Sequence, residues 1–168
     1  MRAKVRELRA DERGLLRGFL HLAIHVPPGG DPVHPGLVDT EPGLRHYVEG
    51  FGQEPGDLAV AAEVDGAVVG VAWSRLLGGD DPGYGHVDDD TPELTVSVLP
   101  DHREQGIGTA LVGALMTALA QAGFVQVSLS VDKTNPAQDL YRRLGFHTVL
   151  DSDDRDDLVM VHSLTGQL

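Results

Sequence analysis

The segment Val98-Leu-Pro-Asp-His-Arg-Glu-Gln-Gly-Ile-Gly108 decides the fold, because it joins a strand to a long helix through a glycine-rich turn. Before it, Glu93–Leu99 alternates polar and apolar residues, which is the period of a strand with two unlike faces. After it, Ile107–Ala122 has apolar residues spaced by four, which is typical of a helix with one buried side. A strand, a turn and a helix N-terminus therefore follow one another directly.

The turn is suited to binding an anion. Gly106 and Gly108 carry no Cβ, so a ligand can approach their amides closely, and Arg103 adds a cation beside them. The first amides of the helix have no partner within it and lie at the positive end of its dipole, which favours a phosphate or pyrophosphate. A P-loop lysine is absent, and Leu111 replaces the third glycine of the dinucleotide fingerprint. A plain strand-to-helix turn is the alternative.

Hydrophobic periodicity predicts seven strands and four helices over the whole chain. The expected strands are Lys4–Arg9, Leu58–Val64, Ala67–Leu77, Glu93–Leu99, Val125–Val131, Phe146–Leu150 and Leu158–His162. The expected helices are Asp11–Ile24, Pro42–Phe51, Ile107–Ala122 and a short one that Asn135 caps and that ends at Gly145. Asp65-Gly66 predicts a hairpin turn, whereas residues 26–36 and 78–90 predict long loops. We expect one mixed α/β domain over residues 1–168, antiparallel in its N-terminal part and βαβ-like in its C-terminal part.

Composition limits the partners of this domain. The 13 Lys and Arg residues against 26 Asp and Glu give a formal charge of −13, which disfavours nucleic acid and anionic membranes and would steer a cation. The absence of cysteine excludes disulfides, cysteine-ligated zinc and a thiol nucleophile. The charged N-terminus is unlike a secretory signal, and no apolar run is long enough for a membrane span, so we expect a cytoplasmic protein.

A second informative stretch is Asn135-Pro-Ala-Gln-Asp-Leu-Tyr-Arg-Arg-Leu-Gly-Phe146. If it is helical, Tyr141 shares a face with Ala137, Leu140 and Leu144 and is at least partly buried. A half-buried tyrosine can present its hydroxyl to a ligand, but a core tyrosine with a satisfied hydroxyl is the alternative.

These two stretches, in this order and separation, resemble the signatures of the GNAT superfamily of acyl-CoA-dependent N-acyltransferases. Arg103-Glu-Gln-Gly-Ile-Gly108 is similar to the Gln/Arg-x-x-Gly-x-Gly/Ala pyrophosphate motif, and Asn135 to Phe146 is similar to the second signature. The resemblance is close from about Leu94 to Val149, and the upstream strand order also fits. It implies a single GNAT-like domain with a mixed, mostly antiparallel sheet of about seven strands, flanked by helices. The splayed central strands would form the acyl-CoA cleft.

The resemblance also implies which residues would contact acetyl-CoA, the acyl donor. The backbone of Val96, Val98 and Leu99 would pair with the pantetheine, the amides of Gln105, Gly106, Ile107, Gly108 and Thr109 would hold the pyrophosphate beside Arg103, and Asn135 and Tyr141 would approach the pantetheine and the thioester sulfur. Many relatives carry glycine in place of Glu104, whose side chain we expect to point outward and to weaken binding slightly.

The implied function is transfer of an acetyl group to a primary amine of a cationic small molecule or peptide, by direct attack in a ternary complex. Glu93 is the candidate general base, directly or through water, unless it is only a solvated residue at a strand start; Tyr141 is the candidate acid for the departing thiolate. A non-catalytic acetyl-CoA sensor or assembly module is the alternative. Some family members dimerise, so a homodimer is also open.

We expect no metal, although two patterns in the sequence are typical of metal sites. His21 and His25 stand four apart on the first predicted helix, as paired zinc ligands can, but the sequence identifies no third ligand. The acidic run Asp151–Asp157 lacks the glycine and the final glutamate of a calcium-binding EF-hand loop, so a hairpin turn explains it better.

Overall fold

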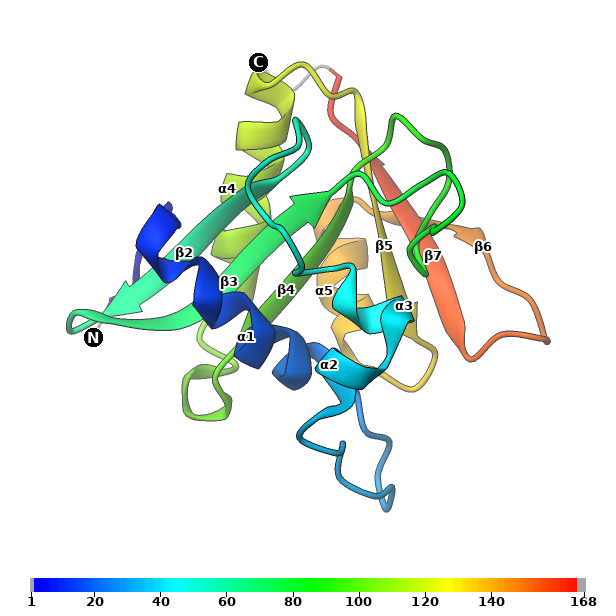
Figure 1. Ribbon diagram of the computed structural model, residues 1–168, viewed down its shortest axis with the longest axis horizontal. Helices are drawn as coiled ribbons and strands as arrows, with labels where there is room; N and C mark the ends of the chain where they lie inside the picture. Colours follow the sequence, from blue (N-terminus) through cyan, green and yellow to red (C-terminus); the bar gives the residue numbers. More distant parts are fainter. Residues whose placement is uncertain (1, 166–168) are drawn as a thin grey trace.

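The computed structural model describes residues 2–165, which form a seven-stranded sheet in the order β1-β2-β3-β4-β5-β7-β6 (Figure 1). The strands are β1 (Lys4–Glu7), β2 (Leu58–Val64), β3 (Ala67–Arg75), β4 (Glu93–Val98), β5 (Gln126–Asp132), β6 (His147–Leu150) and β7 (Asp157–Ser163). Within these residues only β4 and β5 pair in parallel, and the other neighbours are antiparallel. The expected mixed, mostly antiparallel sheet is confirmed.

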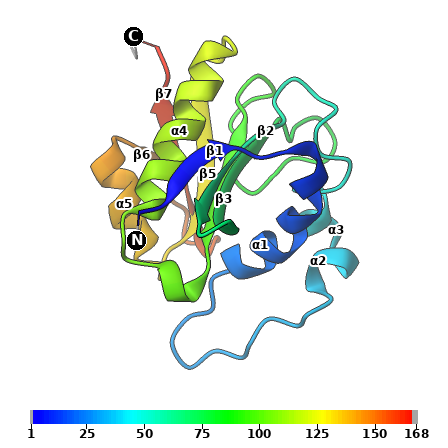
Figure 2. The ribbon, with the colours of Figure 1, turned by 90° about the vertical axis from the view of Figure 1, so that its left-hand side faces the viewer.

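Helices cover both faces of the sheet (Figure 2). One face carries α1 (Leu16–Ala23), α2 (Leu37–Thr40) and α3 (Pro42–Arg45), and the other carries α4 (Ile107–Gln121) and α5 (Ala137–Leu144). Each face has its own buried cluster, with Phe19 and Trp73 on the α1 side and Leu111 and Leu115 on the α4 side.

The sheet opens between its two central strands. β3 and β4 pair at six positions and β5 and β7 at seven, but β4 and β5 pair at one position, Glu93 opposite Ser128. Beyond that pair the two strands diverge, so Glu93 lies at the apex of a V-shaped opening. The expected splay of the central strands is present.

Some predicted elements differ from the observed ones. The helix predicted from Asp11 begins as a 3-10 helix, Ala10–Leu15, because the Glu12 carboxylate accepts from the Arg9 amide and fixes a tight first turn. The helix predicted over Pro42–Phe51 ends at Arg45, where the carbonyls of the next residues bond to a side chain of β3. The one-turn helix α2 has too little periodicity to be predicted.

The last predicted helix also begins later than expected. α5 starts at Ala137 with Pro136 at the capping position, although the Asn135 Oδ1 still accepts from the Ala137 amide at 2.9 Å. The hairpin turn is confirmed, since Asp65 and Gly66 both have positive φ (52° and 84°) between β2 and β3.

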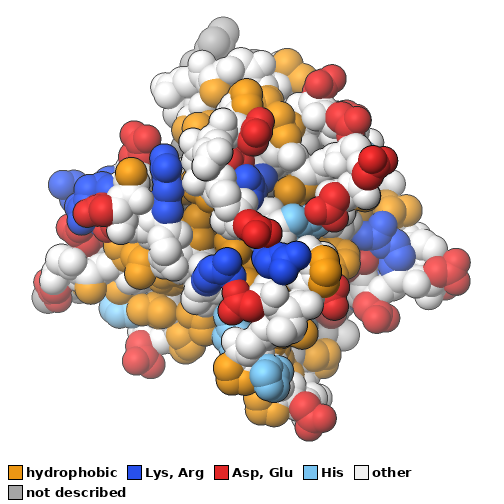
Figure 3. All heavy atoms as spheres, in the orientation of Figure 1, with side chains coloured by type: hydrophobic (Ala, Val, Ile, Leu, Met, Phe, Trp, Pro, Cys, Tyr) orange, Lys and Arg blue, Asp and Glu red, His pale blue; other side chains and the backbone are white. Residues whose placement is uncertain are grey.

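Acidic side chains predominate on one part of the surface. In Figure 3 they outnumber the basic ones on the right-hand side, where the β3–β4 loop and the β6–β7 loop lie. These loops carry Asp80, Asp81, Asp88, Asp89 and Asp90, and Asp151, Asp153, Asp154 and Asp156. No helix of the described residues is both long and apolar enough to cross a membrane.

Candidate functional site

The N-terminus of α4 leaves a row of backbone amides without partners. Gly106, the capping residue, has φ +80°, a conformation that glycine adopts without strain and that turns the chain sharply into the helix. The amides of residues 105–109 bond to no group among the described residues, and the first turn contains no acidic side chain. These donors and the helix dipole fit a pyrophosphate, as the sequence predicts.

The open edge of β4 offers further backbone groups. The Leu99 amide bonds to Val69 of β3 and the Pro92 carbonyl bonds to Ser128 of β5, so even-numbered backbone groups of β4 face the opening. Those of Val96 and Val98 therefore lack a partner strand, although the Val98 carbonyl accepts from Arg103 Nε at 2.9 Å.

The prediction that the Leu99 backbone pairs with pantetheine is wrong. Its amide already bonds to Val69, and its carbonyl already accepts from the His102 amide at 2.9 Å. The Leu99 backbone is therefore not free to pair with pantetheine. The alternation of the sequence could not reveal this, because it does not show where the ladder to β3 ends.

Glu104 is exposed, and its backbone is strained. Its φ of +62° lies in the left-handed region, which glycine occupies at lower cost than glutamate. The exposed position agrees with the expectation that the side chain points outward.

Replacing Glu104 with glycine is expected to raise stability by about 0.5 kcal/mol net, because relief of the left-handed strain outweighs the greater freedom of unfolded glycine. The affinity for acetyl-CoA should rise about twofold, because an exposed and screened negative charge is removed. Thermal unfolding and calorimetric titration measure the two effects, and Glu104→Gln separates charge from backbone conformation. A fall in affinity in both variants would contradict an outward-pointing, weakly repulsive Glu104.

Tyr141 on α5 is buried within the α4-side core. Its ring packs edge to face against Phe146 with centroids 5.8 Å apart, and its hydroxyl makes no hydrogen bond within the described residues. Burial raises its pKa to about 12. The predicted burial is confirmed, but the alternative of a core tyrosine with a satisfied hydroxyl is not.

Glu93, by contrast, faces the α1-side core. It is 4% exposed, and its carboxylate accepts the Tyr47 hydroxyl at 2.5 Å and the Gly85 amide at 3.1 Å. Burial raises the pKa of Glu93 to about 7, and these two hydrogen bonds oppose that rise. A solvated residue at a strand start is therefore the wrong description. Glu93 and Tyr141 therefore lie on opposite faces of the sheet, and Glu93 lies at the apex of the opening between β4 and β5.

Tyr47 is the clearest member of this site that the sequence did not reveal. It follows α3, is 5% exposed, and accepts the Tyr84 amide at 2.8 Å while it donates to Glu93. Burial raises its pKa, and the neighbouring Glu93 raises it further. The only signal was an apolar face over residues 42–51, which indicates burial but not a polar partner 46 residues away.

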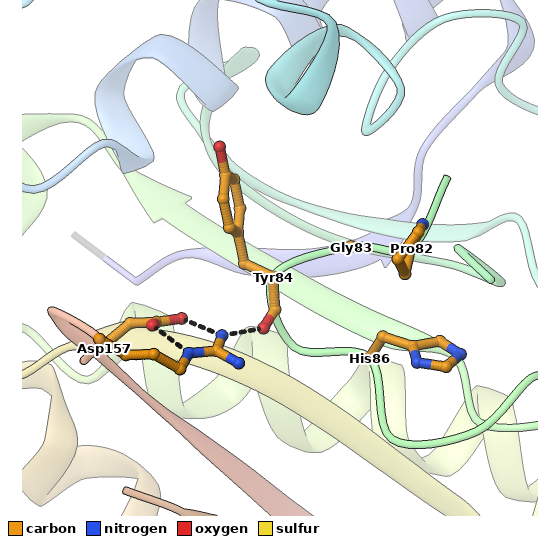
Figure 4. Close-up of a pocket in the computed structure, with 6 residues that line it drawn as sticks. Pro82, Gly83, Tyr84, His86 and Asp157 are labelled. Atoms are coloured by element: carbon orange, nitrogen blue, oxygen red, sulfur yellow. Dashed lines mark hydrogen bonds and ion pairs between the residues drawn. The ribbon is translucent and has the colours of Figure 1, made fainter. Parts of the chain in front are cut away.

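A pocket of about 550 Å³ lies near Glu93, which does not itself line it. It is lined by Pro82, Gly83, Tyr84, His86, Arg155 and Asp157, which come from the β3–β4 loop and the end of the β6–β7 loop (Figure 4). Arg155 bonds to both Asp157 oxygens at 2.9 Å and to the Tyr84 carbonyl at 2.7 Å, so it joins the two loops. Gly83, which lines the pocket, and Gly85 both lie against the Glu93 carboxylate, since a Cβ on either would collide with it.

The first helix lines a different, apolar pocket. This pocket of about 300 Å³ is bounded by Gly14, Leu15, Gly18, Phe19, Leu22 and Leu99. Among residues 2–165, no three His, Asp or Glu side chains are grouped to hold a metal ion. His25 instead lies 3.0 Å from the Thr134 hydroxyl.

Comparison with known proteins gives a consistent likeness. A sequence model of the acetyltransferase (GNAT) family matches residues 26–146. Mycothiol acetyltransferase from Clavibacter sepedonicus is 34% identical over 94 residues, which are 55% of this chain and 28% of that protein. An N-alpha-acetyltransferase from Sulfurisphaera tokodaii is 38% identical over 98 residues, which are 52% of this chain and 55% of that protein. The match thus spans only about a quarter to a half of these relatives.

A solved structure extends the likeness over nearly the whole chain. The GNAT superfamily phosphinothricin acetyltransferase from Sinorhizobium meliloti, in complex with acetyl-CoA, has a TM-score of 0.64 and 21% identity. The alignment covers 97% of this chain and 89% of that one. At this identity the likeness supports the fold alone.

Proposed function

The chain belongs to the acetyltransferase (GNAT) family, and on that premise we propose that it transfers an acetyl group from acetyl-CoA to a primary amine. The observation that carries the proposal is the opening between β4 and β5. Unpaired backbone groups of β4 line one side of it, and the turn after β4 ends in the free amides at the start of α4. When bound, acetyl-CoA would supply the thioester that the amine attacks. The amides of Gln105, Gly106, Ile107, Gly108 and Thr109 would hold its phosphates, and Val96 and Val98 would pair with its pantetheine.

Glu93 would remove the proton that the acceptor amine must lose. An alkylammonium has a pKa near 10.4, so neutralising it at pH 7 costs about 4.6 kcal/mol. A carboxylate whose pKa is raised to about 7 is a better base than an ordinary glutamate and is still half ionised at neutral pH. Because Gly83 and Gly85 lie against the Glu93 carboxylate, we expect their segment to shift, or a water to carry the proton, when the acceptor is bound.

Tyr141 would assist the departing sulfur as a hydrogen-bond donor. Its pKa of about 12 exceeds that of a typical thiol, about 8.5, so full proton transfer to the thiolate is uphill by about 4.8 kcal/mol. A neutral phenol without a protein partner can still donate to a developing negative charge. The sulfur then takes, through water, the second proton that the acceptor nitrogen loses on becoming an amide.

Tyr141→Phe is expected to lower kcat by about tenfold and to leave KM for acetyl-CoA nearly unchanged, because one hydrogen bond to a charged group is lost in the transition state. Its Tm should not fall, because the hydroxyl has no partner within the described protein. Steady-state kinetics and thermal unfolding check both statements. A rise in KM with kcat intact would make Tyr141 a binding residue.

The acceptor is proposed to be a cationic small molecule or peptide amine. The two loops that line the pocket are rich in aspartates, and Arg155 in its lining is already engaged by Asp157. Such a surface would attract a cation from solution.

Added salt should therefore lower kcat/KM for the amine strongly, because it screens this attraction. The same parameter for acetyl-CoA should change much less, since its phosphates would be held by short-range amide contacts. Both are measured over a series of salt concentrations. An equal dependence for both substrates would remove the argument for a cationic acceptor.

The proposed function is tested by measuring free-CoA release with acetyl-CoA and a panel of amines, beside calorimetric titration with acetyl-CoA. Binding together with turnover on at least one amine is expected. Binding without turnover on any amine would favour a non-catalytic acetyl-CoA-binding module. Accumulation of acetylated protein before an amine is added would contradict direct transfer in a ternary complex.

A further inference from the structure

The contact between the Tyr47 hydroxyl and the Glu93 carboxylate holds one proton, which the hydroxyl donates. The Tyr47 hydroxyl donates to Oε2 and accepts from the Tyr84 amide, and Oε1 accepts from the Gly85 amide. The described residues give the carboxylate no other hydrogen-bond partner. A proton added to Oε2 would therefore compete with the Tyr47 proton for the same contact, so the arrangement is complete when Glu93 is ionised and Tyr47 is neutral.

Side chains of strand β3 hold the backbone of the segment that contains Tyr47. Trp73 Nε1 donates to the Tyr47 carbonyl at 3.0 Å, and Arg75 Nη1 donates to the carbonyls of His46 and Glu49 on either side of it. Arg75 is in turn held by the Asp57 carboxylate, whose side chain is 1% exposed, at 3.0 and 3.2 Å. Two side chains of β3 thus hold the short segment that presents the phenol to Glu93, and Asp57, which directly precedes β2, holds one of them.

We infer that Tyr47 is a positioning residue for acetyl transfer: it holds the Glu93 carboxylate in one orientation and in its ionised form, ready to accept the proton of the acceptor amine. This inference rests on the proposed function. Tyr47 itself touches no reacting atom and acts through Glu93. In the step, Glu93 takes one proton from the ammonium group of the acceptor, the C–N bond forms and the C–S bond breaks, and the second proton that the nitrogen loses passes through water to the thiolate. Glu93 then returns its proton to solvent.

Other charged groups also face Glu93. His86 from the β3–β4 loop favours its ionised form, Asp157 of β7 opposes it, and Arg155 lies within the same electrostatic neighbourhood. A change at Tyr47 leaves all three in place. A shift in the titration of Glu93 after that change therefore reports on the phenol.

The test is Tyr47→Phe, read by the pH dependence of kcat at saturating acceptor and by the carboxyl-carbon NMR titration of 13C-glutamate-labelled protein. The Glu93 signal is assigned as the one that Glu93→Gln removes. Loss of the phenol is expected to move the Glu93 titration and the acid limb of kcat upward by about one pH unit. Below that limb, kcat should then be about tenfold lower than in the wild-type protein at the same pH. KM for acetyl-CoA should stay unchanged.

The matched variant is Tyr84→Phe, which removes an exposed phenol and keeps the backbone amide that bonds to Tyr47. It should leave the NMR titration of Glu93 at its wild-type pH, and this readout is the one compared because Tyr84 lines the pocket and a change there can alter kcat. If Tyr47→Phe does not fold, protein with 3-fluorotyrosine at position 47 alone keeps the shape and strengthens that phenol as a donor, so both titrations should move to lower pH.

A titration that stays in place in Tyr47→Phe, or in the fluorinated protein when that is used, would overturn the inference, as would a uniform loss of rate at every pH. The NMR titration does not depend on turnover. It can therefore support the Tyr47–Glu93 coupling when no amine is acetylated, in which case the proposed function fails and the positioning role in catalysis fails with it.

Discussion

Glu93→Gln is expected to lower kcat by about 100-fold or more at neutral pH, because general base catalysis typically contributes at least that factor. The acid limb near pH 7 should disappear, because the titrating carboxylate is gone. Glutamine keeps the size of the side chain and can still accept the Gly85 amide bond. The loss should therefore appear in kcat, with KM for acetyl-CoA little changed.

Glu93 should also make the wild-type protein less stable as pH rises, even though its ionised form is the one that acts as the base. The pKa of Glu93 is raised by folding, so its stabilising contribution is complete below about pH 4.5 and is lost as pH rises through about 7. Wild-type protein should thus lose about 3 kcal/mol over that interval through this one group, whereas the glutamine variant should not. Denaturant unfolding at several pH values measures the difference.

The control for this prediction is Glu7→Gln at the exposed end of β1, whose carboxylate bonds to no side chain among residues 2–165. It should leave both the rate and the pH dependence of stability unchanged. A Glu93→Gln enzyme with wild-type kcat would remove Glu93 from the mechanism and leave its burial as a structural feature.

Local patterns predicted the parts of this molecule that depend on neighbours in sequence. The spacing of Gly106 and Gly108 predicted the turn and the helix that leave the amides free, and strict alternation along β4 put Glu93 on the opposite face from Leu94. Asp65-Gly66 predicted its hairpin for the same reason, since only two residues decide the turn.

Contacts between distant segments could not be predicted in this way. Tyr47 meets Glu93 across 46 residues, and Arg155 meets Tyr84 across 71. Both pairs join irregular segments, in which no period fixes the direction of a side chain. The occupied backbone of Leu99 likewise depends on the register between β3 and β4, which periodicity leaves undetermined.

Gly108→Glu should weaken acetyl-CoA binding by about 10- to 100-fold. It places a carboxylate in the first turn of α4, and a unit charge about 6 Å from a phosphate costs up to about 2.8 kcal/mol near a protein surface before screening by salt. A Cβ at this position meets only Leu140 Cδ2 at 3.7 Å, an ordinary contact. A negative charge near a helix N-terminus also favours the helix, so stability should not fall.

Gly113→Glu is the matched variant, because it adds the same side chain to the same helix where a Cβ would meet nothing within 4 Å. Gly113 lies more than one turn beyond the N-terminal amides, so its carboxylate is too far from them to oppose a bound pyrophosphate strongly. Calorimetric titration with acetyl-CoA should show weakened binding in Gly108→Glu and near-wild-type binding in Gly113→Glu, with thermal unfolding measured for both. Equal affinity in the two variants would mean that the phosphates are not held at the start of α4, however well its free amides suit them.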